Sequence, residues 1–434
     1  MLRTLDARGV TDLESFLPSP ELARHPVAAV RDIVAQVRRS GDAAVRLLTQ
    51  RFDGADVVAA RVPSGQLRAS LDSIDPDLRR ALEVAAARIR RCHERRRPVD
   101  HADEDEGILV EERFVPLERA GLYVPGGIAE YPSTVLMTAI PAQAAGVSDL
   151  VMCTPPRADG SVSPVVLAAA ALVGIEEVHA IGGAQAIAAM AYGTESVRRV
   201  DAIAGPGNLF VTLAKREVSD VVKIPAAFAG PSEVVVIADD TVDPRLAAVD
   251  IVVQAEHGPH GLAWLITWSE TVAAEVAERV RAFTESSPRR AAIEATLREN
   301  AYVVLVENAH RAIAVANVVA PEHLELLVAD ADALSRDVRH AGAVFCGQWS
   351  PASLGDYAAG PSHVLPVCRT ARFGSVLGVE DFGRRMHVIR ASEAGLRNVT
   401  PTIARLARAE GLPAHEASVT LRMTERRAWD SNPR

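Results

Sequence analysis

The feature that most constrains the fold is an alternation of two kinds of segment that begins near residue 149. Short apolar runs rich in β-branched residues are separated by alanine-rich stretches with helical patterning, such as residues 184–192 and 209–218. The runs that we predict as strands are Asp149–Cys153, Glu177–Ile181, Val200–Ala204, Glu233–Ala238, Ala263–Trp268, Tyr302–Val306 and Ala343–Cys346. Alternating strands and helices predict parallel sheets covered by helices on both faces, hence an α/β fold.

The segments outside this alternation have other patterns. Residues 1–20 resemble a short N-terminal arm, and helical spacing of apolar residues follows at 20–50 and from Pro76 to about Arg97. Residues 107–125 predict paired strands. The alternation stops after about residue 377, and the mostly helical end of the chain predicts a separate small domain.

Composition excludes several functional classes. The chain has 434 residues, 48% of them hydrophobic and 24% charged, which is typical of globular proteins of two or more domains. A formal net charge of -9 and a pI of about 5.8 argue against nucleic acid or an anionic membrane as a partner. The absence of a signal segment, a membrane-spanning run or a CxxC pair predicts a cytoplasmic protein.

Four glycine-rich turns border the predicted strands. They contain Gly126-Gly127, Gly182-Gly183, Gly205-Pro-Gly207 and Gly230-Pro-Ser232. None completes the GxGxxG fingerprint, so an orthodox dinucleotide-binding mode is not predicted. Any single turn is more often a plain turn, but Gln185, Asn208 and Ser232 supply hydrogen-bonding side chains, and in α/β proteins ligands gather at the carboxyl ends of strands. The four turns together therefore predict a binding face.

A helix end at Gln254–His257 is the first candidate metal site. Asp243-Pro244 predicts the start of this helix and Gly258 its end, so that Gln254 and His257 share one face near the last turn. An amide oxygen and an imidazole are half of a zinc site if other segments supply the rest. The alternative is a polar helix end that faces water.

Two further segments offer ligands for such a site. Asp356 follows a loop rich in Ser and Pro, where it is either a metal ligand or the cap of a turn. His415 in the C-terminal segment is either a fourth ligand or an ordinary exposed histidine. With Gln254 and His257 they form a set of oxygen and nitrogen donors that is compatible with Zn²⁺.

Glu322-His323 places a carboxylate beside an imidazole, a pair suited to general acid–base chemistry, although such pairs are also common on surfaces. Cys153 ends a strand without a histidine beside it in the sequence. We interpret it as a packing residue rather than as a nucleophile.

In these segments the chain resembles the histidinol dehydrogenase family, the zinc- and NAD-dependent enzymes of the last two steps of histidine biosynthesis. The resemblance covers nearly the whole chain. Its motifs occur in order at Gly121–Gly127, Tyr131–Met137, Gly182–Ile187, Gly205–Asn208, Ala229–Glu233, Gln254–Gly258, Ala320–Leu324, Gly355–Tyr357, His363–Pro366 and Glu410–His415. Ten motifs in order are a specific signal.

The resemblance implies two incomplete Rossmann-like domains, a helical N-terminal arm and a small, mainly helical C-terminal domain that is exchanged in a homodimer. The expected domains are an arm at 1–20, a first α/β domain with the zinc and catalytic residues at 21–123 and 232–377, a second α/β domain on the NAD side at 124–231, and a C-terminal domain at 378–434 that completes the partner's site.

The resemblance also assigns roles to residues. It implies that Gln254, His257, Asp356 and His415 bind zinc and that Glu322 and His323 are the acid–base pair. The residues implied to contact substrate are Ser232, His363 and Glu410, together with the acid–base pair and the zinc ligands, and those implied to lie along NAD are Tyr123, Gln185 and Asn208. The implied substrate is L-histidinol, oxidised to L-histidine through bound L-histidinal with reduction of two NAD⁺.

Departures from the family pattern at Lys223–Ala227 and Pro361-Ser362 leave open a paralogue that oxidises another amino alcohol or polyol. A zinc hydrolase that uses Glu322 to activate water is a second alternative, but Gln185 and Asn208 would then have no purpose. A binding protein without catalysis would not need the acid–base pair.

Overall fold

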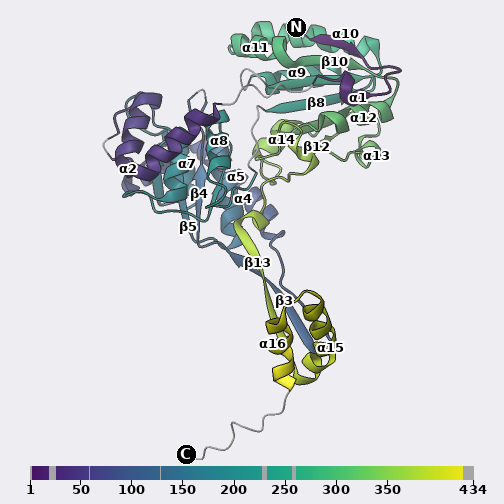
Figure 1. The fold of residues 1–434 in the computed structure, drawn as a ribbon. Coiled ribbons are helices and arrows are strands. Elements are labelled where there is room, and N and C mark those ends of the chain that lie inside the picture. The colour runs from purple at the N-terminus through teal and green to yellow at the C-terminus, as the bar shows by residue number, and fades with distance from the viewer. Residues whose placement is uncertain are drawn as a thin grey trace, which may run out of the picture. The chain divides into compact units, whose positions relative to one another are not determined.

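The computed structural model describes residues 2–18, 26–57, 59–127, 129–226, 232–256 and 261–423. The chain divides into two units, which are described separately (Figure 1). The first contains Met1–Arg97 and Leu117–Phe382, and the second contains Pro98–Pro116 and Gly383–Arg434. Among the described residues, no helix is long and apolar enough to cross a membrane.

The larger sheet of the first unit has six parallel strands in the order β1-β10-β9-β8-β11-β12. Their bounds are β1 Arg3–Asp6, β8 Glu233–Ala238, β9 Leu262–Thr267, β10 Ala301–Leu305, β11 His323–Leu327 and β12 Ala343–Cys346. β1 belongs to the segment that we expected to be a short arm, so the start of the chain supplies an edge strand of this sheet.

Helices cover both faces of this sheet, as the sequence predicted. They are α1 Leu13–Phe16, α9 Pro244–Ala255, α10 Glu270–Ser286, α11 Arg290–Asn300, α12 Ala309–Val319, α13 Ala331–Ser335 and α14 Ala352–Tyr357. Val235 and Ile237 belong to one apolar core, whereas Val234 and Val236 belong to another. Because successive side chains of a strand point to opposite faces, β8 is buried on both sides.

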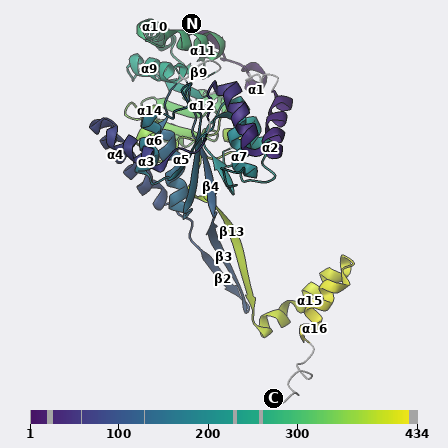
Figure 2. The same ribbon diagram turned by 90° about the vertical axis from the view of Figure 1, so that its left-hand side faces the viewer.

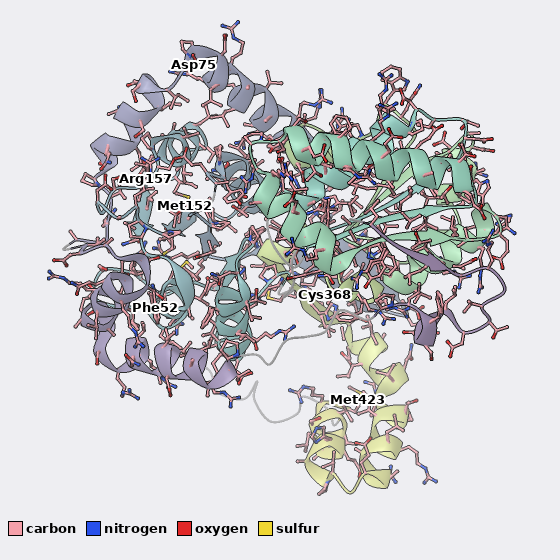
Figure 3. All side chains as sticks on the ribbon, turned by 90° about the horizontal axis from the view of Figure 1, so that it is seen from above. Phe52, Asp75, Met152, Arg157, Cys368 and Met423 are labelled. Atoms are coloured by element: carbon pink, nitrogen blue, oxygen red, sulfur yellow. The ribbon has the colours of Figure 1, made fainter. Side chains whose placement is uncertain are left out.

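The smaller sheet of the first unit is also parallel, in the order β6-β5-β4-β7. Its strands are β4 Arg119–Tyr123, β5 Asp149–Thr154, β6 Glu177–Ala180 and β7 Ala202–Ala204. The helices that alternate with them are α5 Pro132–Ala145, α6 Pro164–Leu172, α7 Gly183–Tyr192 and α8 Leu209–Glu217. In Figure 3, Met152 marks β5.

The N-terminal helices α2 Val27–Asp53, α3 Ser64–Ser73 and α4 Pro76–Glu94 pack against α7, α6 and α5, respectively (Figure 2). We had grouped residues 21–123 with the larger sheet, but these helices and β4 belong to the smaller one. Helical periodicity shows which face of a helix is buried, but it does not show which sheet that face covers.

Two helix starts that the sequence predicted are capped as expected. The Asp75 carboxylate accepts hydrogen bonds from the Asp77 and Leu78 N–H groups at the start of α4. Asp243 accepts from the Arg245 N–H at the start of α9. Both helices have proline in their first turn, where its missing N–H costs no hydrogen bond.

The second unit is an antiparallel sheet of β2 His101–Asp105, β3 Ile108–Pro116 and β13 Gly383–Ala391, in the order β13-β3-β2. Helices α15 Glu393–Ala409 and α16 Pro413–Met423 follow β13 and pack against each other. The expected C-terminal domain is therefore helical over α15 and α16 but also contains a nine-residue strand. Two 3₁₀ turns, Thr370–Arg372 and Val379–Phe382, complete the described elements of the first unit.

Candidate active site

Glu322 and His323 lie at the amino end of β11. Helix α12 ends at Val319, its C-cap residue Ala320 adopts a left-handed conformation with φ of 50°, and β11 begins at His323. Ser232 directly precedes β8, the neighbouring strand, in which Val234 is paired with His323. Ser232 therefore lies at the amino end of β8, not at the carboxyl end of a strand, where we expected the binding face.

The Glu322 carboxylate pairs with a second buried glutamate, Glu233. The Glu233 N–H donates to Glu322 Oε2 (2.9 Å), and the Glu322 N–H donates to Glu233 Oε2 (3.3 Å). Burial raises the pKa of Glu322 to about 7 and, together with the Glu322 charge, raises the pKa of Glu233 to about 8. A carboxyl group with a pKa near neutrality is suited to accept and return a proton.

His323 is held between two carboxylates and a backbone carbonyl. Its Nδ1 lies 3.0 Å from the Glu233 carbonyl and 3.6 Å from Glu322 Oε2, and its Nε2 lies 3.7 Å from Asp356 Oδ1. Burial opposes the charged imidazole, but Glu322 and Asp356 outweigh burial and raise the pKa of His323 to about 9. With Nδ1–H donating to the Glu233 carbonyl, Nε2 is the nitrogen that exchanges protons.

His363 joins this group through the backbone of Asp356. Its Nδ1 hydrogen-bonds with the Asp356 carbonyl (3.1 Å), and its Nε2 hydrogen-bonds with Thr134 Oγ1 on α5 (3.2 Å). The structure thus brings together Glu322, His323, Asp356 and His363, which are dispersed in the sequence.

The described residues give a partial view of the expected zinc ligands. Gln254 lies in the last turn of α9 and is 5% exposed, and its Nε2 has no hydrogen-bond partner among the residues that the structure describes. His257 lies outside the described residues. Asp356 is on α14, and burial and the charges of Asp356 and Glu256 raise the pKa of its neighbour Tyr357.

The other expected residues of this site belong to the second unit. Glu410 caps the end of α15 and His415 is on α16, and both are exposed. Within the described ranges, no group of three or more His, Cys, Asp or Glu side chains could hold a metal. The Gln254 amide, the Asp356 carboxylate and a histidine imidazole are nevertheless donors that Zn²⁺ accepts, so these residue types fit the metal.

The residues expected along NAD meet at the smaller sheet. The Tyr123 hydroxyl accepts a hydrogen bond from the Gly183 N–H (3.0 Å), and an added Cβ at Gly205 would lie 2.1 Å from the Tyr123 carbonyl oxygen. Gln185 is 1% exposed, whereas Asn208 is exposed and caps α8 by accepting from the Val211 N–H (3.1 Å). Gly183 and Gly205 therefore both lie against Tyr123, at its hydroxyl and its carbonyl respectively.

Two acidic residues were missed in the sequence, Asp53 beside the residues expected along NAD and Glu233 beside Glu322. Asp53 Oδ2 accepts a hydrogen bond from Gln185 Nε2 (3.3 Å), and burial raises the pKa of Asp53 to about 6. Its only sequence signal was its position just before Gly54, which ends α2.

Glu233 could have been noticed as a carboxylate directly after Ser232. Cys153 is fully buried, and burial raises the pKa of its thiol, in keeping with a packing role.

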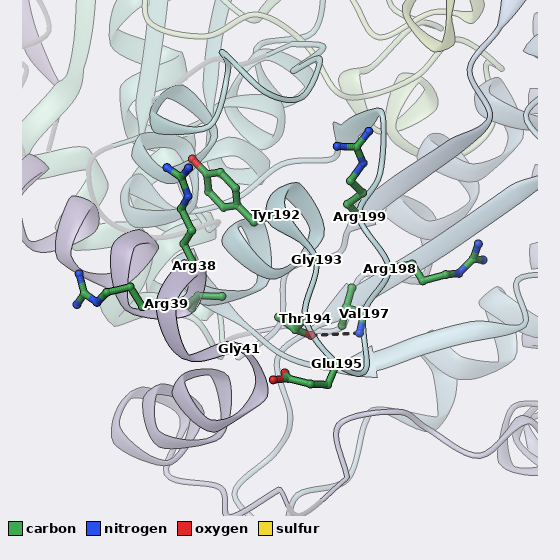
Figure 4. Close-up of a pocket in the computed structure, with 11 residues that line it drawn as sticks. Arg38, Arg39, Gly41, Tyr192, Gly193, Thr194, Glu195, Val197, Arg198 and Arg199 are labelled. Carbon is green, nitrogen blue, oxygen red and sulfur yellow. Dashed lines mark hydrogen bonds between the residues drawn. The ribbon is translucent and has the colours of Figure 1, made fainter.

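A surface pocket of about 750 Å³ lies apart from these residues, and its lining includes Arg38, Arg39, Arg198 and Arg199 (Figure 4). The guanidinium of Arg38 lies over the Tyr192 ring, 5.0 Å from its centroid, and Arg198 pairs with Asp149. None of the residues with an expected site role lines it.

The family model for histidinol dehydrogenase matches residues 20–423. The chain belongs to the histidinol dehydrogenase family. The histidinol dehydrogenase of Parasynechococcus marenigrum is 47% identical over 90% of this chain and 90% of its own length. The histidinol dehydrogenase of Rhizobium meliloti is 44% identical over 97% of this chain and 98% of its own length.

A solved structure agrees with this assignment. The crystal structure of histidinol dehydrogenase from Elizabethkingia anophelis matches with a TM-score of 0.92 at 33% identity and covers 97% of this chain and 98% of that one. The α/β fold with parallel sheets and the resemblance to this family are therefore confirmed. As a member of the histidinol dehydrogenase family, the protein is an NAD-dependent oxidoreductase of histidine biosynthesis.

Proposed function

We propose that the protein oxidises L-histidinol to L-histidine through bound L-histidinal, with a zinc ion in the site and two NAD⁺ reduced. The observation that carries the proposal is the placement of His323, whose Nδ1 is held by the Glu233 carbonyl and whose Nε2 faces Asp356 beside a buried Glu322. In its neutral form, an imidazole oriented in this way can remove a proton from a hydroxyl group while a hydride leaves the same carbon.

Gln254, His257, Asp356 and His415 would hold the zinc. When bound, the ion would orient the imidazole and amine of the substrate, which fixes the reacting carbon in place. Ser232, His363 and Glu410 would bind the substrate beside these residues. Because Glu410 and His415 are in the second unit, we propose that each chain of a homodimer lends them to the other chain's site.

The proton steps then follow from the two side chains. His323 Nε2 takes the hydroxyl proton of the alcohol as the first hydride leaves, which gives the aldehyde. Glu322 removes a proton from a water molecule as that water adds to the aldehyde, and His323 returns its proton to the aldehyde oxygen, which gives the hydrate. His323, neutral again, takes a hydroxyl proton of the hydrate as the second hydride leaves, which gives the carboxylic acid. Tyr123, Gln185 and Asn208 would bind the NAD⁺ that accepts each hydride.

The two departures from the family pattern have structural roles that do not require another substrate. Ser362 is buried, donates to the Met137 carbonyl (3.1 Å) and accepts from the Val364 N–H (3.2 Å). Lys223 donates to the Glu380 carbonyl (3.4 Å). Oxidation of another amino alcohol or polyol remains the alternative that the assay below tests. A cytoplasmic location stays a prediction.

The test is NADH formation by the purified, zinc-loaded protein with L-histidinol, compared with a panel of other amino alcohols and polyols. His323→Ala should lose turnover but keep its zinc, because His323 is a base and not a ligand in this proposal. His310→Ala, at an exposed histidine of α12, is the matched control and should keep both. Turnover of another alcohol but not L-histidinol would refute the proposed substrate, and loss of zinc from His323→Ala would refute the proposed role.

A further inference from the structure

A second buried carboxyl pair lies two residues beyond His323 and has no part in the proton steps above. Glu325 is on β11 and is 0% exposed, and Asp250 is on α9 and is 9% exposed. Because residues i and i+2 of a strand point to the same face, Glu325 shares the face of β11 that carries His323. A buried carboxyl group is costly unless both its oxygens are satisfied, so this pair requires an explanation.

The two oxygens of Glu325 have different environments. Oε1 accepts a hydrogen bond from the Ala352 N–H at the start of α14 (2.7 Å). Oε2 is buried and receives no hydrogen bond from a donor among the described residues. The side chain is, however, hydrogen-bonded to the Asp250 carboxyl group.

Two carboxyl groups can form a hydrogen bond only if one of them carries a proton. Two buried carboxylates side by side would repel each other, so sharing one proton is the arrangement that burial favours. Burial and the nearby Asp250 raise the pKa of Glu325 well above its usual range, and burial also raises the pKa of Asp250. These contacts describe Glu325 as an acid that donates to the Asp250 carboxylate and accepts from the Ala352 N–H through Oε1.

This single side chain joins three elements that carry the proposed site. Asp250 is one turn before Gln254 on α9, and Ala352 is one turn before Asp356 on α14. β11, which carries Glu325, also carries His323. A shift of either helix along β11 would move a proposed zinc ligand by the same amount.

We propose that Glu325 is a positioning residue, a neutral carboxylic acid that fixes α9 and α14 to β11 and thereby sets the positions of Gln254 and Asp356. The inference rests on the proposed zinc ligands. An apolar residue at position 325 could not replace Glu325, because only a side chain with one donor and one acceptor can hydrogen-bond with both the Asp250 carboxylate and the Ala352 N–H.

The test compares Glu325→Gln with Glu325→Leu, with Glu278→Gln at an exposed position of α10 as the control. An amide has the same shape as the acid and can accept from Ala352 and donate to Asp250. Glu325→Gln should therefore keep zinc affinity, measured by competition with a chelator, and kcat within about threefold of the control. Glu325→Leu should lose zinc affinity by about 10- to 100-fold, as is usual when a group that orients metal ligands is removed.

Two measurements that do not need Glu325→Leu, the zinc affinity of Glu325→Gln and an infrared spectrum, keep the inference falsifiable if Glu325→Leu does not fold. Infrared difference spectra of the unmutated protein and Glu325→Gln should show a protonated carboxyl band at pH 8 that only the unmutated protein has. A loss of zinc affinity of tenfold or more in Glu325→Gln, or the absence of that band, would overturn the inference. Equal zinc affinity in folded Glu325→Leu would also overturn it.

Failure of the proposed substrate would give a different result. If Glu325→Gln binds zinc as tightly as the control and Glu325→Leu binds it more weakly, but no protein oxidises L-histidinol, the proposed function fails and the positioning role of Glu325 stands. If L-histidinol is oxidised and the order of zinc affinities is not seen, the positioning role fails alone.

Discussion

Lys215 offers a prediction whose size follows from its burial. It lies on α8, is 3% exposed, and its ammonium group donates to the Gly205 carbonyl. Burial lowers its pKa from 10.5 to about 7. Since each pKa unit corresponds to 1.36 kcal/mol, this drop means that burial disfavours the charged amine by about 5 kcal/mol.

Lys215→Met keeps the apolar stem but removes the amine. At pH 7 the variant avoids most of that cost but leaves the Gly205 carbonyl without its donor, which costs about 1–3 kcal/mol. We therefore expect the variant to be more stable than the unmutated protein by about 1–4 kcal/mol at pH 7.

The pH dependence gives the sharper test. Between pH 7 and 10.5 the unfolded chain binds a proton at Lys215 that the folded chain does not, so the stability of the unmutated protein should rise with pH over that range. The advantage of the variant should be largest at or below pH 7 and should disappear as the pH rises. Urea unfolding of both proteins from pH 6 to 9.5, at equal protein and zinc concentrations, measures the difference. A difference that does not change with pH, or a less stable variant at pH 6, would refute the reasoning.

Two further substitutions test the smaller sheet. Arg119 is buried at the start of β4 and pairs with Asp149 and Glu177. Arg119→Met should therefore lower the free energy of unfolding by about 3–5 kcal/mol in thermal or denaturant unfolding. A change below about 1 kcal/mol would contradict a buried ion pair. Gly205 has φ of +113°, and an added Cβ would lie 2.1 Å from the Tyr123 carbonyl oxygen. Gly205→Ala should therefore raise the KM for NAD⁺ at least tenfold while the zinc content is unchanged. An unchanged KM would show that this turn does not bind the cofactor.

Local patterns in the sequence predicted the parts of the fold that depend on local chemistry. The apolar runs of β8 and β9 and the aspartate caps of α4 and α9 are examples. The edge strand β1 was missed because it is short and largely exposed, so it lacks the apolar run of a buried strand. The strand β13 was missed because it is rich in charge and mostly exposed.

The candidate site also combines features that a local pattern predicts with contacts that depend on the fold. Glu322 and His323 are adjacent in the chain, so their pairing could be read directly. The contact of Glu233 with Glu322 spans 89 residues and depends on the register of β8 against β11, which no local pattern gives. The contact of His323 with Asp356 depends in turn on where α14 packs, and was suggested by resemblance to the family alone.

The number of NADH molecules formed for each L-histidinol consumed tests the central claim most directly. With limiting L-histidinol, excess NAD⁺ and the zinc-loaded protein, we predict about two NADH per L-histidinol, with L-histidine as the product. The first turnover of Glu322→Gln should yield about one, because hydration of the aldehyde is slowed before the second hydride transfer. One NADH per L-histidinol from the unmutated protein, with the aldehyde released, would contradict the account.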